Sequence, residues 1–278
     1  MKAAIKKLLF GDATPAPSTA GQLSWQCNIC GTANKCQVTS LERENGPCSS
    51  CHAVVRFRAI AAILTLRLFG KVMVLTDLPV QQHVKGIGMS DAHCYANLLT
   101  TKLGYTNTYY HRQPLLDIKN PGAQWLGNND FVITSDVFEH VPPPVQEAFD
   151  NLYALLKPGG VVIFSVPFSY EDETREHYPE LHDFKLRQEG NGDWVLENVT
   201  KDGRHQKFRH LFFHGGPGAT MEMRLFSFPA LQRHFAKAGF VDLRVHSEPY
   251  FEHGIYWWST WHLMLSAMKP AETAIAQE

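Results

Sequence analysis

The sequence has no long hydrophobic run. None of its apolar stretches approaches the roughly 20 residues of a membrane-spanning helix. Lys6 and Lys7 interrupt the apolar start, which is too short for the core of an export signal. An excess of one charge is also missing, because 26 basic and 27 acidic residues leave a net charge of −1. A chain with so little net charge has no long-range electrostatic attraction to nucleic acid or a membrane surface, so we expect neither as a partner. We predict a cytoplasmic protein.

The serine-hydrolase motif G-x-S-x-G does not accompany the glycine-rich stretch HGGPG at residues 214–218. This absence matters because HGGPG alone could belong to the oxyanion loop of a hydrolase. We expect a tight turn or a mobile loop over a pocket instead. Internal repeats are absent too, and 278 residues with 44% hydrophobic content suffice for one large domain and one small one.

Cysteine occurs in one informative arrangement. Cys27 and Cys30 form a C-x-x-C pair, Cys48 and Cys51 form a second, and 17 residues separate the pairs. This spacing is typical of a zinc ribbon, in which two tight turns present four thiolates to one ion. Two disulfides are the alternative, but they need an oxidising compartment. We predict a structural zinc site, because four thiolates leave no open position on the metal.

Apolar segments that alternate with helical patterns follow the cysteines. Such alternation indicates parallel βαβ units, and therefore an α/β fold with helices on both faces of a mostly parallel sheet. Helices are predicted at 54–70, 92–104 (ended by Gly104), 143–160 and 226–240. Strands are predicted at seven places, namely 71–77, 84–91, 105–111, 130–136, 161–168, 241–247 and 260–269.

Residues 168–224 interrupt this alternation. They are polar and rich in histidine and aromatic residues, and a long insertion on a regular scaffold usually carries function. We expect this insertion to cover a substrate pocket. The aromatic run YWWSTW at 256–261 has two interpretations, which are stacking on a ring of the substrate and ordinary core packing.

The segment DFVITSDVFEHV, followed by LYALLKPGGVVIFSVPF, resembles the class I, Rossmann-like S-adenosylmethionine-dependent methyltransferases of the type 11-like group. The resemblance covers about residues 60–268 and is specific across 130–167. It implies a seven-stranded sheet, S-adenosylmethionine as cofactor, and methyl transfer to a small-molecule or glycan acceptor, with oxygen favoured over nitrogen. HGGPGATMEMRLFS looks like a subgroup that often accompanies polysaccharide or secondary-metabolite biosynthesis.

The domain boundaries follow from the cysteine motif and the resemblance together. We expect a flexible tail at 1–20, a zinc ribbon at 21–56, a methyltransferase domain at 57–268 with the lid-like insertion at 168–224, and a disordered tail at 269–278. One feature departs from the family, whose first strand runs into a glycine loop. The segment VMVLTDLPVQQHV at 72–84 has no glycine, and we assign GIG at 86–88 to the second strand.

The resemblance also implies the cofactor-binding residues. An acid after the second strand suits the ribose hydroxyls, which assigns Asp91 to them, and Asp117 lies where the family often contacts the adenine amino group. A turn or helix cap is the alternative role for each aspartate. The full expected set is Asp77, Gly88, Asp91, Asp117, Ser135 and Asp136.

Candidate catalytic residues follow the strand 130–136 and occur again in the insertion. His140 is the natural general base for a hydroxyl acceptor, although the Glu139–His140 pair could simply fix a loop. The complete candidate set is Glu139, His140, Tyr178, His182 and His214. Two other functions stay open. The same fold could cyclise S-adenosylmethionine or transfer its aminocarboxypropyl group, or the chain could be a non-enzymatic adaptor.

Overall fold

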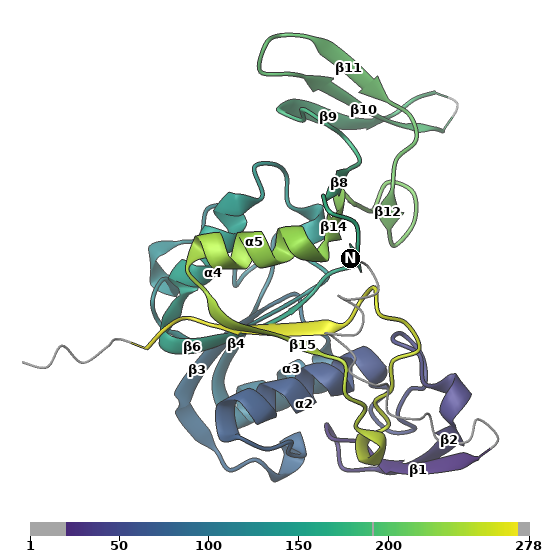
Figure 1. Cartoon of the computed structure of the whole chain (residues 1–278), viewed down its shortest axis with the longest axis vertical. Coiled ribbons are helices and arrows are strands. Elements are labelled where there is room, and N and C mark those ends of the chain that lie inside the picture. Colours follow the sequence, from purple (N-terminus) through teal and green to yellow (C-terminus); the bar gives the residue numbers. More distant parts are fainter. Residues whose placement is uncertain (1–20, 191, 272–278) are drawn as a thin grey trace, which may run out of the picture.

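The computed structural model describes residues 21–190 and 192–271. The tail expected at 1–20 and most of the one expected at 269–278 lie outside these residues. The described chain is built on one six-stranded sheet with helices on both faces (Figure 1). None of the described helices combines the length and the apolar character needed to cross a membrane.

The central sheet confirms the α/β prediction. Four strands are parallel, and the last two described strands of the sheet are antiparallel to their neighbours. Ile87 and Val132 are buried on one face of the sheet and Phe131 and Ile133 on the other, as in other parallel sheets covered by helices. In spatial order the strands are β15 (Val241–His246), β16 (Met264–Met268), β6 (Leu156–Ser165), β5 (Asn129–Ser135), β3 (Gln81–Met89) and β4 (Leu103–Thr108).

Six strands form this sheet, whereas the sequence predicted seven. The difference lies at 71–77, where the structure has the short 3-10 helix η2 (Leu75–Asp77) and no strand. The apolar pattern there has another cause. Leu75 is fully buried against the ribbon, and its backbone N–H donates to the Asn28 carbonyl at 2.9 Å. The pattern therefore reflected burial in the core, not pairing with the sheet.

Helices cover the two faces in pairs. Figure 1 shows α2 (Val55–Phe69) and α3 (His93–Lys102) on one side of the sheet, and α4 (Gln146–Leu155) and α5 (Phe228–Ala238) on the other. Helix α2 ends at Gly70, which adopts a left-handed φ of 73°. The prediction that Gly104 ends α3 is wrong, because α3 ends at Lys102 and Gly104 already lies in β4.

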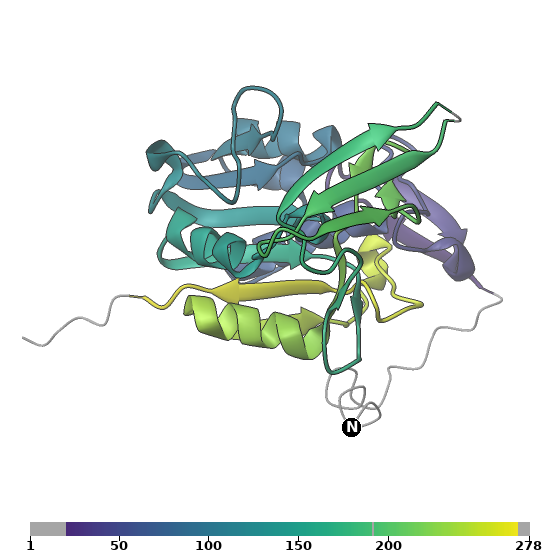
Figure 2. The same cartoon turned by 90° about the horizontal axis from the view of Figure 1, so that it is seen from above.

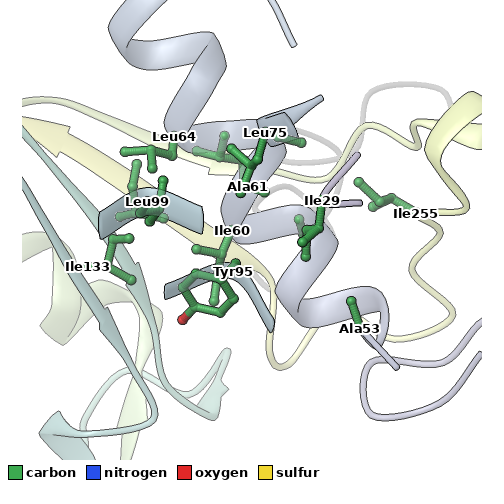
Figure 3. Packing of buried hydrophobic residues seen from close by; sticks show 14 of the residues in the cluster. Ile29, Ala53, Ile60, Ala61, Leu64, Leu75, Tyr95, Leu99, Ile133 and Ile255 are labelled. Carbon is green, nitrogen blue, oxygen red and sulfur yellow. The ribbon is translucent and has the colours of Figure 1, made fainter. Parts of the chain in front are cut away.

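The ribbon shares its core with the large domain. Its strands β1 (Gln22–Gln26) and β2 (Ala33–Gln37) pair antiparallel and precede the 3-10 turn η1 (Val38–Ser40). In Figure 3, Ile29 and Ala53 of the ribbon segment lie in the same buried cluster as side chains of α2, α3 and β5. This shared cluster also includes Ile255, from the loop before β16.

The Arg58 side chain links helix α2, the ribbon segment and the loop at 253–254. This side chain is fully buried. It donates hydrogen bonds to the carbonyls of Gly46 at 2.9 Å, His253 at 3.0 Å and Gly254 at 2.7 Å, and to that of Ala53 as well. Burial lowers the pKa of Arg58 to about 10, so the guanidinium remains charged at neutral pH.

The insertion forms its own small sheets. Figure 1 shows the sheet of β9 (Asp183–Gln188), β10 (Trp194–Val199) and β11 (His205–Phe208) standing away from the central sheet. A second view shows the same sheet crossing above the central one (Figure 2). Closer to the domain lie β7 (Phe168–Ser169), β8 (Arg175–Glu176), β12 (Phe213–His214), β13 (Thr220–Met221) and β14 (Arg224–Ser227). The short turns η3 (Ala123–Trp125), η4 (Phe138–His140) and η5 (Phe251–His253) complete the described elements.

We predict that Arg58→Ala lowers the free energy of unfolding by at least about 3 kcal/mol, because several buried carbonyls lose a charged donor. Chemical denaturation would measure the change. The matched control is Arg175→Ala, whose side chain is 61% exposed and which should change stability by no more than about 0.5 kcal/mol. If Arg58→Ala fails to fold, Arg58→Lys is measured instead. A free energy of unfolding for the Arg58 variant equal to that of Arg175→Ala would contradict the role assigned to Arg58.

Candidate functional site

The strand order places a ligand site between β3 and β5. From β3 the chain adds β4 on one side, and then returns to add β5 and β6 on the other side. The loops at the carboxyl ends of β3 and β5 therefore diverge. In open α/β sheets, the crevice at such a reversal is where ligands bind. The residues directly after these two strands, Ser90 and Asp136, both have left-handed backbones, with φ of 63° and 55°. Strained backbone of this kind clusters at ligand sites.

The structure corrects the assignment of the glycine segment. GIG at 86–88 lies in β3, the first strand of the sheet, and not in the second. A side-chain carbon on Gly88 would lie 1.9 Å from Oδ2 of Asp91 and 2.1 Å from the Tyr105 hydroxyl. Gly88 is therefore required because these two side chains meet beside it. The departure inferred from 72–84 disappears, because the first strand of the sheet begins only at Gln81 and its glycines, at 86 and 88, lie beyond that segment.

Asp91 consequently has a different environment from the one expected. It follows the first strand, and its buried Oδ2 accepts a hydrogen bond of 2.5 Å from the Tyr105 hydroxyl. Burial raises the pKa of Asp91 to about 6. The second strand, β4, ends at Thr108 without an acid directly after it. The premise for assigning Asp91 to the ribose, that it ends the second strand, is wrong.

The other expected aspartates lie apart. Asp77 is exposed and precedes β3, so it lies at the amino end of that strand, away from the crevice. Asp117 follows β4 and holds a turn, since its Oδ1 accepts a hydrogen bond of 2.9 Å from the Lys119 backbone N–H. This is the turn role that was the alternative for Asp117.

Two arginines converge on the end of β5. Nη2 of Arg43 lies 2.6 Å from Oδ1 of Asp136, and Nη1 of Arg56 donates to the Ser135 hydroxyl at 3.0 Å. Arg56 also donates two hydrogen bonds, of 2.7 and 3.0 Å, to the Glu44 carboxylate. Burial would raise the pKa of Asp136, but the two guanidiniums outweigh it and hold that pKa below its ordinary value. The end of β5 is therefore a charged, hydrogen-bonded network.

Sequence reasoning missed both arginines. They belong to the ribbon segment and the first turn of α2, far from β5 in the chain. A signal did exist, because Arg56 and Arg58 interrupt an otherwise apolar helical pattern. One atom of this network is still unsatisfied, since Nε of Arg43 is buried and has no hydrogen-bond partner among the described residues.

Three of the five predicted catalytic residues converge. Glu139 and His140 lie in η4, just after β5, and His214 reaches them from β12 of the insertion. Oε1 of Glu139 lies 3.8 Å from Nε2 of His140 and 3.9 Å from Nδ1 of His214. The two imidazole rings pack edge to face with their centres 4.7 Å apart. The insertion therefore contributes directly to the cluster at the end of β5.

The ionisation of this cluster is set by burial. Burial, reinforced by the negative charge of Asp136, raises the pKa of Glu139 well above its ordinary value. Burial also lowers the pKa of His140 below its ordinary value, so this imidazole is neutral at pH 7. A neutral imidazole can accept a proton or bind a metal ion.

The remaining two candidates lie outside the cluster. The Tyr178 hydroxyl accepts a hydrogen bond of 2.9 Å from the Phe212 backbone N–H, and its ring is buried in a hydrophobic cluster of the insertion. His182 is exposed, and its backbone N–H donates to Asn198. The structure therefore does not bring these side chains to the carboxyl ends of the strands.

The four cysteines of the ribbon meet as the spacing predicted. Cys27 and Cys51 have sulfurs 3.7 Å apart, and those of Cys30 and Cys48 are 3.6 Å apart. Four thiolates about 2.3 Å from a central zinc ion would form a tetrahedron with edges of about 3.8 Å, whereas a disulfide requires about 2.05 Å. The sulfur positions therefore fit a structural zinc ion and not disulfides.

We predict that Cys48→Ser removes the zinc and unfolds the ribbon, because a segment this short depends on its metal for a stable core. Metal analysis after passage through a mild chelator should give about one zinc for the native chain and none for the variant. Cys36→Ser is the matched control, since Cys36 is not one of the four clustered thiols. Zinc retained by Cys48→Ser would contradict the assignment.

The free energy of unfolding should depend on pH through the ionisation of Asp91. The pKa of Asp91 is higher in the folded chain than in the unfolded one, so its contribution is complete at acidic pH and is lost as the pH rises through about 6. Above that pH the buried carboxylate needs the Tyr105 hydroxyl. Tyr105→Phe should therefore cost about 1–3 kcal/mol at pH 8 and less at pH 5.

Urea unfolding at the two pH values would measure this difference. Tyr110→Phe is the control, because Tyr110 is 61% exposed and its replacement should have little effect at either pH. An equal loss for Tyr105→Phe at pH 5 and pH 8 would show that the carboxylate does not depend on the tyrosine.

Comparison with solved structures finds methyltransferases of similar fold. One is the 1,6-didemethyltoxoflavin-N1-methyltransferase of Burkholderia thailandensis (TM-score 0.43, 16% identity, covering 76% of each chain). Another is an amino pentose methyltransferase of Micromonospora echinaspora (TM-score 0.40, 13% identity, covering 76% of this chain and 88% of that one). A third is an S-adenosylmethionine-dependent methyltransferase of Clostridium acetobutylicum (TM-score 0.38, 10% identity, covering 76% and 98%).

A search of curated proteins finds no match. The family assignment rests on a family model described as a methyltransferase domain, which matches residues 66–245 and thus more than half of the chain. The match includes the strands on both sides of the crevice and confirms the expectation of an enzyme with S-adenosylmethionine as its cofactor. The chain belongs to the methyltransferase domain family.

Proposed function

We propose that the protein transfers a methyl group from S-adenosylmethionine to an oxygen of a small-molecule or glycan acceptor, and that it does so in the cytoplasm. The acceptor side is supported by the convergence of η4 with the segment from β12 to β14 at the end of β5. There Met223 donates its backbone N–H to the Glu139 carbonyl at 2.7 Å. Nη1 of Arg224 donates to the Phe138 and Val141 carbonyls at 3.1 and 2.6 Å.

The cofactor end of the proposed site is the crevice between β3 and β5. Arg43 has a buried Nε without a partner, and it lies beside Ser165 and Asp136. Such a donor suits the carboxylate of the methionine moiety, because a charge-assisted hydrogen bond contributes about 1.5–3 kcal/mol. The ribbon would then hold the cofactor in place, with its zinc fixing the segment that carries Arg43.

The acceptor end is the cluster of Glu139, His140 and His214. S-adenosylmethionine supplies an activated methyl group, so the chain must chiefly align the acceptor oxygen with it, and alignment can account for about 7–11 kcal/mol of a barrier. His140 is neutral, and the Met221 carbonyl accepts a hydrogen bond of 2.9 Å from its Nδ1. That bond leaves the lone pair on Nε2, which can receive the proton of an acceptor hydroxyl.

Two other functions make different predictions. A reaction at the aminocarboxypropyl group would release methylthioadenosine, whereas methyl transfer releases S-adenosylhomocysteine. An adaptor need not bind the cofactor at all. Incubation with S-adenosylmethionine and a panel of phenols, sugars and glycans, followed by product analysis, would separate the three. Release of S-adenosylhomocysteine that depends on the acceptor supports the proposal, and its absence with every acceptor, together with no cofactor binding, would favour the adaptor.

We expect Arg43→Ala to weaken S-adenosylmethionine binding at least about tenfold, as titration calorimetry would measure. Decarboxylated S-adenosylmethionine is the matched ligand control. It lacks the carboxylate, so it should bind the native chain and Arg43→Ala equally. An equal loss for both ligands would mean that Arg43 only supports the fold of the ribbon.

We expect His140→Gln to lower kcat by about 10²–10⁴-fold for a hydroxyl acceptor and to leave the dissociation constant of the cofactor unchanged. Because burial lowers the pKa of His140, native activity should fall only at pH values below the ordinary range of histidine. His210→Gln, at an exposed position of the insertion, is the control. Native kcat in His140→Gln would show that no general base acts there.

A further inference from the structure

We propose that Glu139, His140 and His214 form a second metal site, which takes a divalent first-row transition ion such as zinc. Their donor atoms all lie within 4.8 Å of one another. The site is distinct from the cysteine site of the ribbon, and these two are the groups of metal-ligating side chains that residues 21–190 and 192–271 bring together in this way.

The carboxylate of Glu139 lacks the partners that a buried charged group requires. The Glu139 side chain has no exposed surface, and neither carboxylate oxygen has a hydrogen-bond partner among the described residues. A buried carboxylate without a partner is costly, and proteins usually satisfy it with a hydrogen bond, an opposite charge or a metal ion. Nε2 of His140 and Nδ1 of His214 lie 3.8 and 3.9 Å from Oε1. These distances are too long for hydrogen bonds but suit a shared ion.

A hydrogen bond to the backbone fixes the orientation of the His140 ring. Its Nδ1 lies 2.9 Å from the Met221 carbonyl oxygen, which can only accept, so Nδ1 carries the proton. Nε2 is therefore unprotonated in the neutral ring and faces Glu139. A histidine that binds a metal typically donates its other N–H in this way to a carbonyl or a carboxylate.

His214 has the complementary arrangement. Its Nε2 lies 2.6 Å from Oε2 of Glu222, which leaves Nδ1 to face Glu139. Glu222 is itself held by His177, whose Nε2 lies 2.9 Å from its other oxygen. A carboxylate behind a histidine fixes the tautomer and strengthens the ring as a ligand. In both rings the nitrogen that makes no other hydrogen bond faces the same carboxylate oxygen, Oε1 of Glu139, and in a neutral ring that nitrogen carries the lone pair that binds a metal.

The distances allow a common ion. Nitrogen and oxygen ligands bind zinc at about 2.0–2.2 Å, so two donors of one ion lie at most about 4.4 Å apart. The two measured histidine–carboxylate distances satisfy this limit, and small rotations of the side chains would complete the site. Two imidazoles and one carboxylate suit zinc or another borderline divalent ion, and three protein ligands leave at least one position open.

The open position links this site to the proposed function. An acceptor hydroxyl bound there would lose its proton to solvent more readily, and His140 would act as a ligand instead of a base. This consequence rests on the proposed methyl transfer, but binding of the ion does not. The two proposals can therefore fail separately, because ion binding is measured without cofactor or acceptor.

Cobalt(II) titration of the chain with its ribbon zinc in place tests the site. We expect one further equivalent to bind, with visible absorption bands and without the sulfur-to-cobalt band that displacement of the ribbon zinc would produce. Glu139→Gln and His214→Ala should each weaken binding at least about 100-fold, and Glu222→Gln by about 10–100-fold, because it removes only the support of a ligand. His205→Ala, at an exposed position, should bind cobalt normally.

Several outcomes would overturn the proposal. These are no saturable binding, equal affinity in Glu139→Gln and the native chain, or loss of binding in His205→Ala, which would indicate an adventitious surface site. If Glu139→Gln does not fold, His214→Ala alone decides, since His214 lies in the insertion and is 41% exposed. Methyl transfer that persists without a bound second ion would refute the role of the ion and leave the proposed function intact.

Discussion

The first turn of helix α2 connects the parts of this molecule. Arg56 and Arg58 lie two residues apart and therefore point in different directions. Arg58 is buried among carbonyls of the ribbon and of the 253–254 loop. Arg56 extends to the end of β5 and to Glu44. Because both guanidiniums belong to one rigid turn, the position of the ribbon and the position of the charges at the crevice are set together. A displaced ribbon would leave Arg58 with unsatisfied buried donors.

The zinc ribbon is therefore part of the site in structural terms, although its metal is remote from any chemistry. Four thiolates leave zinc no open position, so the ion acts through the chain that it holds. That chain includes Arg43, whose side chain is 12% exposed and whose guanidinium pairs with Asp136. A bound ligand between β3 and β5 would have the large domain on one side and this charged segment on the other. The ribbon's sharing of the hydrophobic core with α2 and α3 makes this arrangement rigid.

The sequence predicted the sheet and the cysteine cluster better than the path of the chain into the crevice between β3 and β5. Helices and strands followed from apolar periodicity, and the cysteine spacing predicted the four-sulfur cluster. Residues 71–77 misled because periodicity reports burial, and Leu75 is buried against the ribbon without joining the sheet. That one error moved GIG into the second strand and gave Asp91 a ribose role. Arg43 could not be predicted, since its partner Asp136 lies 93 residues away in the chain and only folding brings the two together.

Asp136 and Glu139, which lie in the same loop, have pKa values shifted in opposite directions. Asp136 is matched by two arginines, which hold its pKa low and keep it ionised. Glu139, three residues on, is buried without a cation from the described chain, and its pKa is raised. The charge of Asp136 contributes to that increase, so the ion-paired network at the end of β5 also disfavours a bare carboxylate at Glu139. Glu139 is then stable either as the neutral acid or beside a cation that the chain does not itself provide. Because His140 and His214 each engage one ring nitrogen elsewhere and turn the other toward Glu139, their geometry favours the cation.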